Sequence, residues 1–166
     1  MISCDAASNL AHPVLWEEEM ESHRSTRRSF TVRTTSQGNE VVKIDPQWTW
    51  QKEPVLRIAE CCTLKDNWDS YGGHPPSFDT VLAAIDLIDS IPQHDPPRPR
   101  VVPLATGGIQ LEWKVGQREL DIEVSPDSTY RYLKFDPSQT GGDLNSEFNL
   151  DSLSGVENLL SWLIAG

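Results

Sequence analysis

The sequence predicts an α+β domain in which an antiparallel β-meander is covered on one face by two or three helices. Residues 109–135 contain three runs in which apolar and polar residues alternate, with turn residues between them. Alternation at period two is typical of half-buried strands. Two amphipathic helical patterns precede these runs and a third follows them. Helices that bury their apolar stripes on one face of such a sheet give a two-layer domain.

The first two runs have a register that can be read from the sequence. Gly116 and Gln117 fit a two-residue turn, because Gly supplies the positive φ that such a turn needs. Val115 then faces Arg118, and counting outward places six apolar residues on one face. These are Ile109, Leu111, Trp113, Leu120, Ile122 and Val124. A slip of one residue would expose all of them, so the apolar pattern and the turn specify the same register.

The other face of this hairpin is polar and mostly acidic. Lys114 faces Glu119, which is an attractive pair. Glu112 faces Asp121, and like charges directly opposite each other destabilise a sheet mildly. We expect a cation, an arginine from elsewhere in the chain or solvent to offset this repulsion.

The remaining elements are predicted from local signals at their ends. The chain divides into an N-terminal arm, residues 1–50, and an α+β domain, residues 51–166. Pro54 suits a first helical turn, Ser77 suits an N-cap, and Pro103 indicates a sheet edge. The predicted sheet has four strands, within residues 100–135. The other predicted elements are a hairpin in the arm at 29–35 and 41–44, helices at 54–66 and 77–91, a strand at 100–106, a loop at 137–149 and a final helix from Leu153.

Helical periodicity predicts which side chains face the core. The first helix is expected to turn Cys62 inward and Cys61 to the side. The buried stripe of the second helix is expected to comprise Phe78, Val81, Leu82, Ile85 and Ile88.

Charge and composition narrow the function classes. The formal net charge of -11 disfavours direct nucleic-acid binding, which needs a basic surface. We expect no membrane span and no signal peptide, because the chain has no long apolar run and no basic start followed by one. An odd count of three cysteines, two of them adjacent, favours a reducing, cytoplasmic compartment. No phosphate-cradling or metal-ligand pattern is present, so no cofactor is expected.

The segment 67–76 concentrates the residues with the strongest binding character. Its candidate binding residues are Asn67, Trp68, Asp69, Tyr71 and His74. One interpretation is structural, with Trp68 in the core while Asn67 and Asp69 cap backbone groups. The other is a recognition surface, because Trp and Tyr are frequent interface anchors. A small-ligand sensor built on the same loop is a further alternative.

The N-terminal arm is a second candidate binding element. Basic residues gather there in an otherwise acidic chain, and tryptophans lie outside the periodic elements. The candidate residues are Arg24, Arg27, Arg28, Trp48 and Trp50. Such an arm would order on binding another protein chain, either a copy of this one or a different partner.

One strand triplet raises an enzymatic alternative. Glu112, Trp113 and Lys114 form a Glu-x-Lys sequence of the kind found on a strand of restriction-like nucleases. The usual upstream Asp is missing from residues 100–106, and Asp121 across the hairpin is the substitute. The alternative is therefore a metal-dependent nuclease or hydrolase using Glu112, Asp121 and Lys114. We assign no catalytic residue and no metal ligand in the leading hypothesis.

Two motifs together resemble a known family. The sequence N-W-D-S-Y-G-G-x-P-P-S at residues 67–77 and P-x-x-x-G-G-I-Q-L-E-W at 103–113 resemble small bacterial proteins with an N-W-D-G-Y-G-A-type loop and a G-G-[IV]-x-x-E-W strand. Ser70 and Gly73 stand where that family more often has Gly and Ala. The resemblance, over residues 55–135, implies a bacterial origin, an α+β fold and a link to mobile or defence loci. The family has no established activity, so no functional residue is carried over.

These observations favour a non-enzymatic protein-interaction module. We expect an accessory, inhibitory or antitoxin-like subunit of a bacterial, defence-linked system. Its negative charge would suit the masking of a basic surface on a partner protein.

Overall fold

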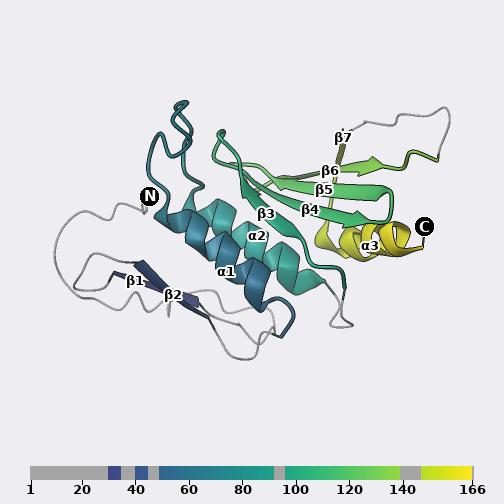
Figure 1. The fold of residues 1–166 in the computed structure, drawn as a ribbon, viewed down its shortest axis with the longest axis horizontal. Coiled ribbons are helices and arrows are strands. Elements are labelled where there is room, and N and C mark those ends of the chain that lie inside the picture. Colours follow the sequence, from purple (N-terminus) through teal and green to yellow (C-terminus); the bar gives the residue numbers. More distant parts are fainter. Residues whose placement is uncertain (1–29, 35–39, 45–48, 92–95, 139–146, 166) are drawn as a thin grey trace.

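Five antiparallel strands form the central sheet, and the helices lie on one side of it (Figure 1). The computed structural model describes residues 30–34, 40–44, 49–91, 96–138 and 147–165. The strands follow each other in chain order across the sheet, which confirms the predicted antiparallel meander and the α+β fold. They are β3 (Arg100–Pro103), β4 (Ile109–Val115), β5 (Arg118–Val124), β6 (Tyr130–Phe135) and β7 (Glu147–Asn149).

The register of β4 and β5 is the one that the sequence predicts. Trp113 pairs with Leu120 and Leu111 with Ile122, and all four side chains are buried. Gly116 has a φ of 60° in the connecting turn. Pro103 lies on edge strand β3, as predicted, where its missing N–H costs no ladder hydrogen bond.

The fifth strand corrects the prediction of a four-stranded sheet. β7 lies at the end of the segment that we expected to be a loop, and it pairs with β6. The ring of Phe148 stacks on Tyr132 with 5.3 Å between ring centroids. A strand of three residues is too short to show a recognisable alternation, and pairing with β6 supplies the order that its own sequence does not reveal.

The described helices are α1 (Lys52–Glu60), α2 (Phe78–Ser90) and α3 (Val156–Ile164). Both α2 and α3 pack on β4 and β5, whereas α1 packs on α2 and β3 (Figure 1). The side chains of Val55, Val81 and Leu163 join those of the sheet in one core. The helices therefore cover the apolar face of the sheet and leave its polar face directed away from them.

The predictions of which helix side chains are buried are wrong at Cys61, Cys62 and Leu82. Cys61 is buried and donates its thiol to the Arg57 carbonyl at 3.4 Å, whereas Cys62 is only half-buried. The chain tightens into a 3₁₀ turn at Cys61–Thr63, which changes the rotation per residue and turns Cys61 inward. Leu82 is 38% exposed, because α2 is held between α1 and the sheet and buries Ala84 and Leu87 instead.

Burial also makes Cys61 a poor nucleophile. Burial of its side chain, with a smaller effect of the nearby Glu60 carboxylate, raises the pKa of the Cys61 thiol to about 11. At neutral pH the reactive thiolate is therefore scarce. Cys61 is a core residue.

A partly buried ion pair joins α3 to the sheet. The Arg118 guanidinium donates to Asp136 Oδ2 at 2.7 Å and to the Trp162 carbonyl at 2.7 Å. Its Cζ atom lies 5.1 Å from the centroid of the Trp162 ring. A hydrogen bond from Ser138, followed by that from Arg118, lowers the pKa of Asp136. Asp136 is therefore ionised at neutral pH, and Arg118 fixes the end of α3 against β5.

The predicted N-terminal hairpin is present. β1 (Phe30–Thr34) and β2 (Glu40–Ile44) pair antiparallel as a separate two-stranded sheet. The hairpin does not extend the main sheet, and β2 lies against α1 (Figure 1).

Trp113 provides the test of this fold. Its side chain is 2% exposed and its Nε1–H donates to the Pro97 carbonyl at 2.8 Å. We expect Trp113→Ala to lower the free energy of unfolding by about 3–5 kcal/mol, measured by urea denaturation. Trp113→Phe keeps an aromatic ring and should cost less, mainly through the Pro97 carbonyl left unpaired. A change below about 1 kcal/mol for Trp113→Ala would contradict the packing described.

Candidate functional site

The loop at residues 67–76 is ordered by its own side chains. The Asn67 side-chain oxygen accepts from the Gly72 N–H at 2.8 Å. Asp69 Oδ1 accepts from the N–H groups of Tyr71 and Gly73 at 2.8 and 2.9 Å. The Asn67 N–H donates to the Gly73 carbonyl at 2.8 Å, which closes the loop. Asn67 and Asp69 therefore cap backbone groups, as one of the two interpretations predicts.

These hydrogen bonds also fix the charge of the loop. The two backbone N–H groups, that of Tyr71 first, lower the pKa of Asp69. Asp69 is thus a carboxylate at neutral pH, and its role is to hold the turn. A Cβ atom on Gly73 would lie 2.8 Å from the Asp69 carboxyl carbon, so the short side chain at Gly73 permits this arrangement.

The loop docks on the turn at residues 104–108 between β3 and β4. The His74 N–H donates to the Ala105 carbonyl at 2.9 Å, and His74 forms a parallel bridge with Thr106. A Cβ atom on Gly108 would lie 2.9 Å from the Val124 carbonyl oxygen, and Gly107 has a φ of 87°. The two motifs that carry the family resemblance therefore meet in space. Gly107 faces the loop at Pro75, whereas Gly108 permits the close approach of β5.

The aromatic residues of the loop are exposed to different degrees. The Tyr71 side chain is 94% exposed. Trp68 is half-buried, and its Nε1–H donates to the His74 carbonyl at 3.3 Å. The expectation that Trp68 is a core residue is wrong, because it lies outside the core cluster, on the loop itself. Beside them, His74 Nδ1 lies 3.5 Å from Asp66 Oδ1, and both side chains are exposed. The loop thus presents two aromatic residues with a polar surround.

Of the candidate residues of the N-terminal arm, only Trp50 is among the described residues, and it is buried. Arg24, Arg27, Arg28 and Trp48 lie outside the described residues. Trp50 is 6% exposed and belongs to the core cluster. It is therefore not an exposed interface anchor. It lies just before α1, where the chain enters the helix, and an irregular segment gives no periodicity from which its inward direction could be predicted.

On the polar face of β4 and β5, three of the four acidic residues have a cationic partner. The pairs are Glu112 with Arg100 at 3.2 Å, Glu123 with Arg131 at 2.8 Å, and Glu119 with Lys114. Arg100 lies on β3 directly opposite Glu112. It is the arginine from elsewhere in the chain that the like-charge pair of β4 and β5 was expected to need.

Asp121 is the exception among these acids. Within the described part of the chain, no Lys, Arg or His side chain forms an ion pair with it. Partial burial raises the pKa of Asp121, and the nearby charges of Glu112 and Glu119 raise it further. Its ionised carboxylate is therefore less stable here than in water.

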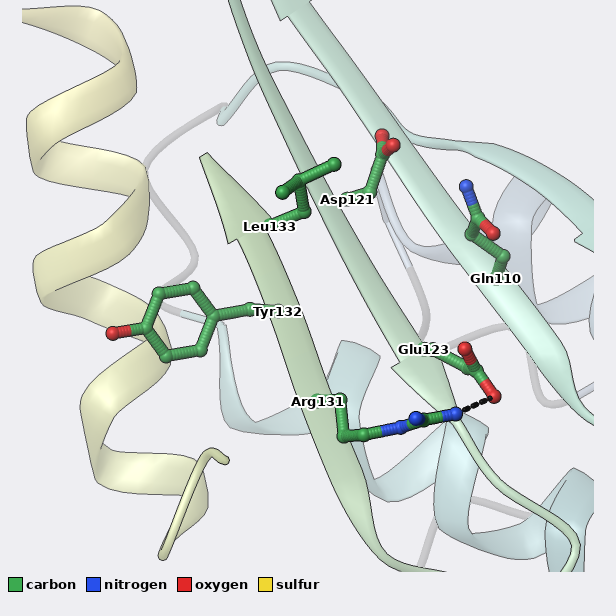
Figure 2. A pocket seen from close by; sticks show the side chains of 6 residues that line it. All are labelled: Gln110, Asp121, Glu123, Arg131, Tyr132 and Leu133. Atoms are coloured by element: carbon green, nitrogen blue, oxygen red, sulfur yellow. Dashed lines mark hydrogen bonds and ion pairs between the residues drawn. The ribbon is translucent and has the colours of Figure 1, made fainter. Parts of the chain in front are cut away.

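A small hollow of about 80 Å³ lies beside Asp121 (Figure 2). It is lined by Gln110, Asp121, Glu123, Arg131, Tyr132 and Leu133. Figure 2 shows the Arg131–Glu123 ion pair at one end and Leu133 beside Asp121, whereas the Tyr132 ring points away. Sequence reasoning missed Gln110, Arg131 and Leu133. Extending the register across the next turn would have placed Arg131 opposite Glu123.

The residues of the nuclease alternative share this face but lack a metal-binding arrangement. Glu112 and Asp121 are directly opposite, as predicted, and Lys114 pairs with Glu119. Edge strand β3 carries no acid. The described residues contain no group of three or more His, Cys, Asp or Glu side chains that could hold a metal ion.

The chain matches no known protein family, no curated protein and no solved structure. The family resemblance of the two motifs therefore stays an expectation. Among the described residues, no helix has both the length and the apolar character needed to cross a bilayer.

Backbone strain in the loop gives a testable pair of variants. Ser70 has a φ of 66°, which is unfavourable for a residue with a Cβ atom, and Gly72 has a φ of 90°. We expect Ser70→Gly to raise the free energy of unfolding by up to about 1 kcal/mol. Gly72→Ala should lower it by about 1 kcal/mol through strain alone, since nothing lies within 4 Å of the added Cβ. Thermal unfolding measures both, and the opposite signs would refute this loop conformation.

Asp121 provides a test with a pH dependence. Folding raises its pKa, so the folded state favours the protonated carboxyl and the carboxylate costs stability above the ordinary aspartate pKa. We expect Asp121→Asn to raise the free energy of unfolding at pH 7 by roughly 0.2–1 kcal/mol. The gain should disappear as the pH falls below about 4. The control is Asp151→Asn at an exposed position, which should change little. An equal gain from both variants would show a general charge effect instead.

Proposed function

We propose that the protein is a non-enzymatic interaction module that binds another protein chain through the 67–76 loop. The observation that carries this proposal is the 94% exposure of Tyr71 on a loop held by hydrogen bonds at both ends. An aromatic side chain on a pre-ordered loop offers a large contact area, and its backbone loses little entropy on binding. A side chain needed only for folding would gain nothing from such exposure.

The surroundings of Tyr71 support the same conclusion. Trp68 adds half-buried aromatic surface, and Asp66, Asp69 and His74 provide polar groups around it. Interfaces commonly combine aromatic anchors with a polar rim. The net charge of -11 favours a partner with a basic surface. Opposite charges speed the association of two proteins and make their contact surfaces electrostatically complementary. In biological terms we propose an accessory or inhibitory subunit, antitoxin-like, of a bacterial defence-linked system.

A photo-crosslinking experiment tests the role of Tyr71. We would replace Tyr71 with p-benzoylphenylalanine in the full chain, express it in the native host and identify adducts by mass spectrometry. The control carries the same group at Ile164, which is 55% exposed on α3. We expect one dominant protein adduct at position 71 that is absent at position 164. No adduct, or the same adducts at both positions, would refute a recognition role for the loop.

Affinity measurements with the captured partner quantify the effect. Tyr71→Ala should weaken binding at least about tenfold, the range expected for an aromatic interface anchor. Ile164→Ala should leave the affinity unchanged. Equal affinities for the wild-type protein and Tyr71→Ala would contradict the proposal.

A further inference from the structure

Among the described acidic side chains of β4 and β5, one has no cationic partner, and its place in the sheet is defined. Glu112, Glu119 and Glu123 each form an ion pair with a basic residue of the same sheet. Asp121 lies between them, and no ion pair to it exists among the described side chains. Asp121 is therefore the acidic residue of this group that a cation from a binding partner would neutralise.

The hollow beside Asp121 has a mixed lining. Its charged groups are Asp121, Glu123 and Arg131, so its net charge is negative by one. Gln110 donates its side-chain N–H to Glu112 at 3.3 Å, which leaves its amide oxygen as the acceptor for a ligand. Leu133 contributes an apolar wall opposite Asp121 (Figure 2). One cation with a flat apolar face would match this lining.

A guanidinium group fits this description better than a metal ion or an ammonium group. Hard metal ions require about six or more oxygen ligands, and this hollow offers one unpaired carboxylate. Guanidinium donates two parallel hydrogen bonds to a carboxylate and is weakly hydrated, so its plane packs on apolar groups such as Leu133. The hollow, of about 80 Å³, has room for one such group.

The hollow lies next to the loop of the proposed function. Glu123 Oε1 is 3.7 Å from the position of a Cβ atom on Gly108, in the turn on which the 67–76 loop docks. Leu133 and Phe135 are half-buried on the same face of β6 and add apolar contact area. A partner that covers Tyr71 can therefore extend from the loop along this face of the sheet.

We infer that the polar face of the sheet is a docking surface for a basic protein partner, whose arginine side chain enters the hollow and pairs with Asp121. This inference rests on the proposed function and names the chemistry of the partner. The arginine would neutralise the Asp121 carboxylate and donate a second hydrogen bond to the Gln110 side-chain oxygen.

A peptide titration tests the arginine pocket without knowledge of the partner. The probe is the blocked peptide acetyl-Gly-Arg-Gly-amide, added to the isotope-labelled full chain at low ionic strength and followed by NMR. The comparison peptides carry citrulline, which is uncharged, or lysine in place of arginine. We expect saturable shifts at Gln110, Asp121 and Leu133 with the arginine peptide, and affinities about tenfold weaker with the other two. Equal shifts with the citrulline or lysine peptide would overturn the inference.

Matched variants complete the test. Asp121→Asn should weaken binding of the arginine peptide about tenfold, whereas Asp151→Asn, with the same change of charge, should leave it unchanged. Since Asp121→Asn relieves repulsion from Glu112 and Glu119, loss of binding could not be attributed to unfolding. Unchanged binding by Asp121→Asn would overturn the inference.

The captured partner separates this inference from the proposed function. If Tyr71→Ala weakens the complex and Asp121→Asn does not, the loop function stands and the arginine pocket is refuted. If the arginine peptide binds but no adduct forms at position 71, the pocket stands and the loop function is refuted. We expect both variants to weaken the complex.

Discussion

The pairing of Trp113 with Leu120 determines most of what this protein presents to its surroundings. Because side chains alternate along a strand, this one pairing assigns every residue of β4 and β5 to a face. The apolar face receives α2 and α3, and Trp113 also ties the segment before β3 to the sheet through the Pro97 carbonyl. The acidic face follows from the same register. Its charges were therefore placed together by the requirement to bury six apolar residues on the opposite side.

The second constraint is the contact between the 67–76 loop and the 104–108 turn. A single backbone hydrogen bond, from the His74 N–H to the Ala105 carbonyl, joins segments about thirty residues apart in the chain. Gly107 supplies the φ of 87° in this turn, and the position of a Cβ atom there lies 3.5 Å from the Pro75 carbonyl oxygen. The loop is thereby fixed relative to the sheet. This rigidity is what gives the exposed Tyr71 and the Asp121 hollow a constant spatial relationship that a partner could use.

Sequence reasoning succeeded where one periodicity persisted over a whole element. The alternation around Gly116 was sufficient to place Leu111, Trp113, Leu120 and Ile122 in the core. It failed where the local geometry changes or where the element is short. Cys61 turns inward because α1 tightens into a 3₁₀ turn, and β7 is too short for a pattern.

The candidate site was predictable only in part, for a related reason. The loop residues could be selected from their chemistry, and the capping roles of Asn67 and Asp69 from their type. Burial of Trp50 and half-exposure of Trp68 depend on tertiary packing that no local pattern contains. Likewise, Glu112 and Asp121 could be placed opposite each other by counting. Arg100 neutralises Glu112 and not Asp121 because β3 lies beside β4. The order of the strands around the hairpin cannot be obtained by counting residues.

The register of β4 and β5 can be measured directly by NMR in the folded 166-residue chain. Residues flanking a two-residue turn form a hydrogen-bonded pair, and the pair type alternates outward, so Glu112 and Asp121 form a closely spaced pair. We predict a strong nuclear Overhauser effect between the Hα protons of Glu112 and Asp121, and another between those of Gln110 and Glu123. Effects that connect Glu112 to Leu120 or to Ile122 instead would show a shifted register. Such a shift would move the acidic residues into the core and contradict both the fold and the docking surface derived from it.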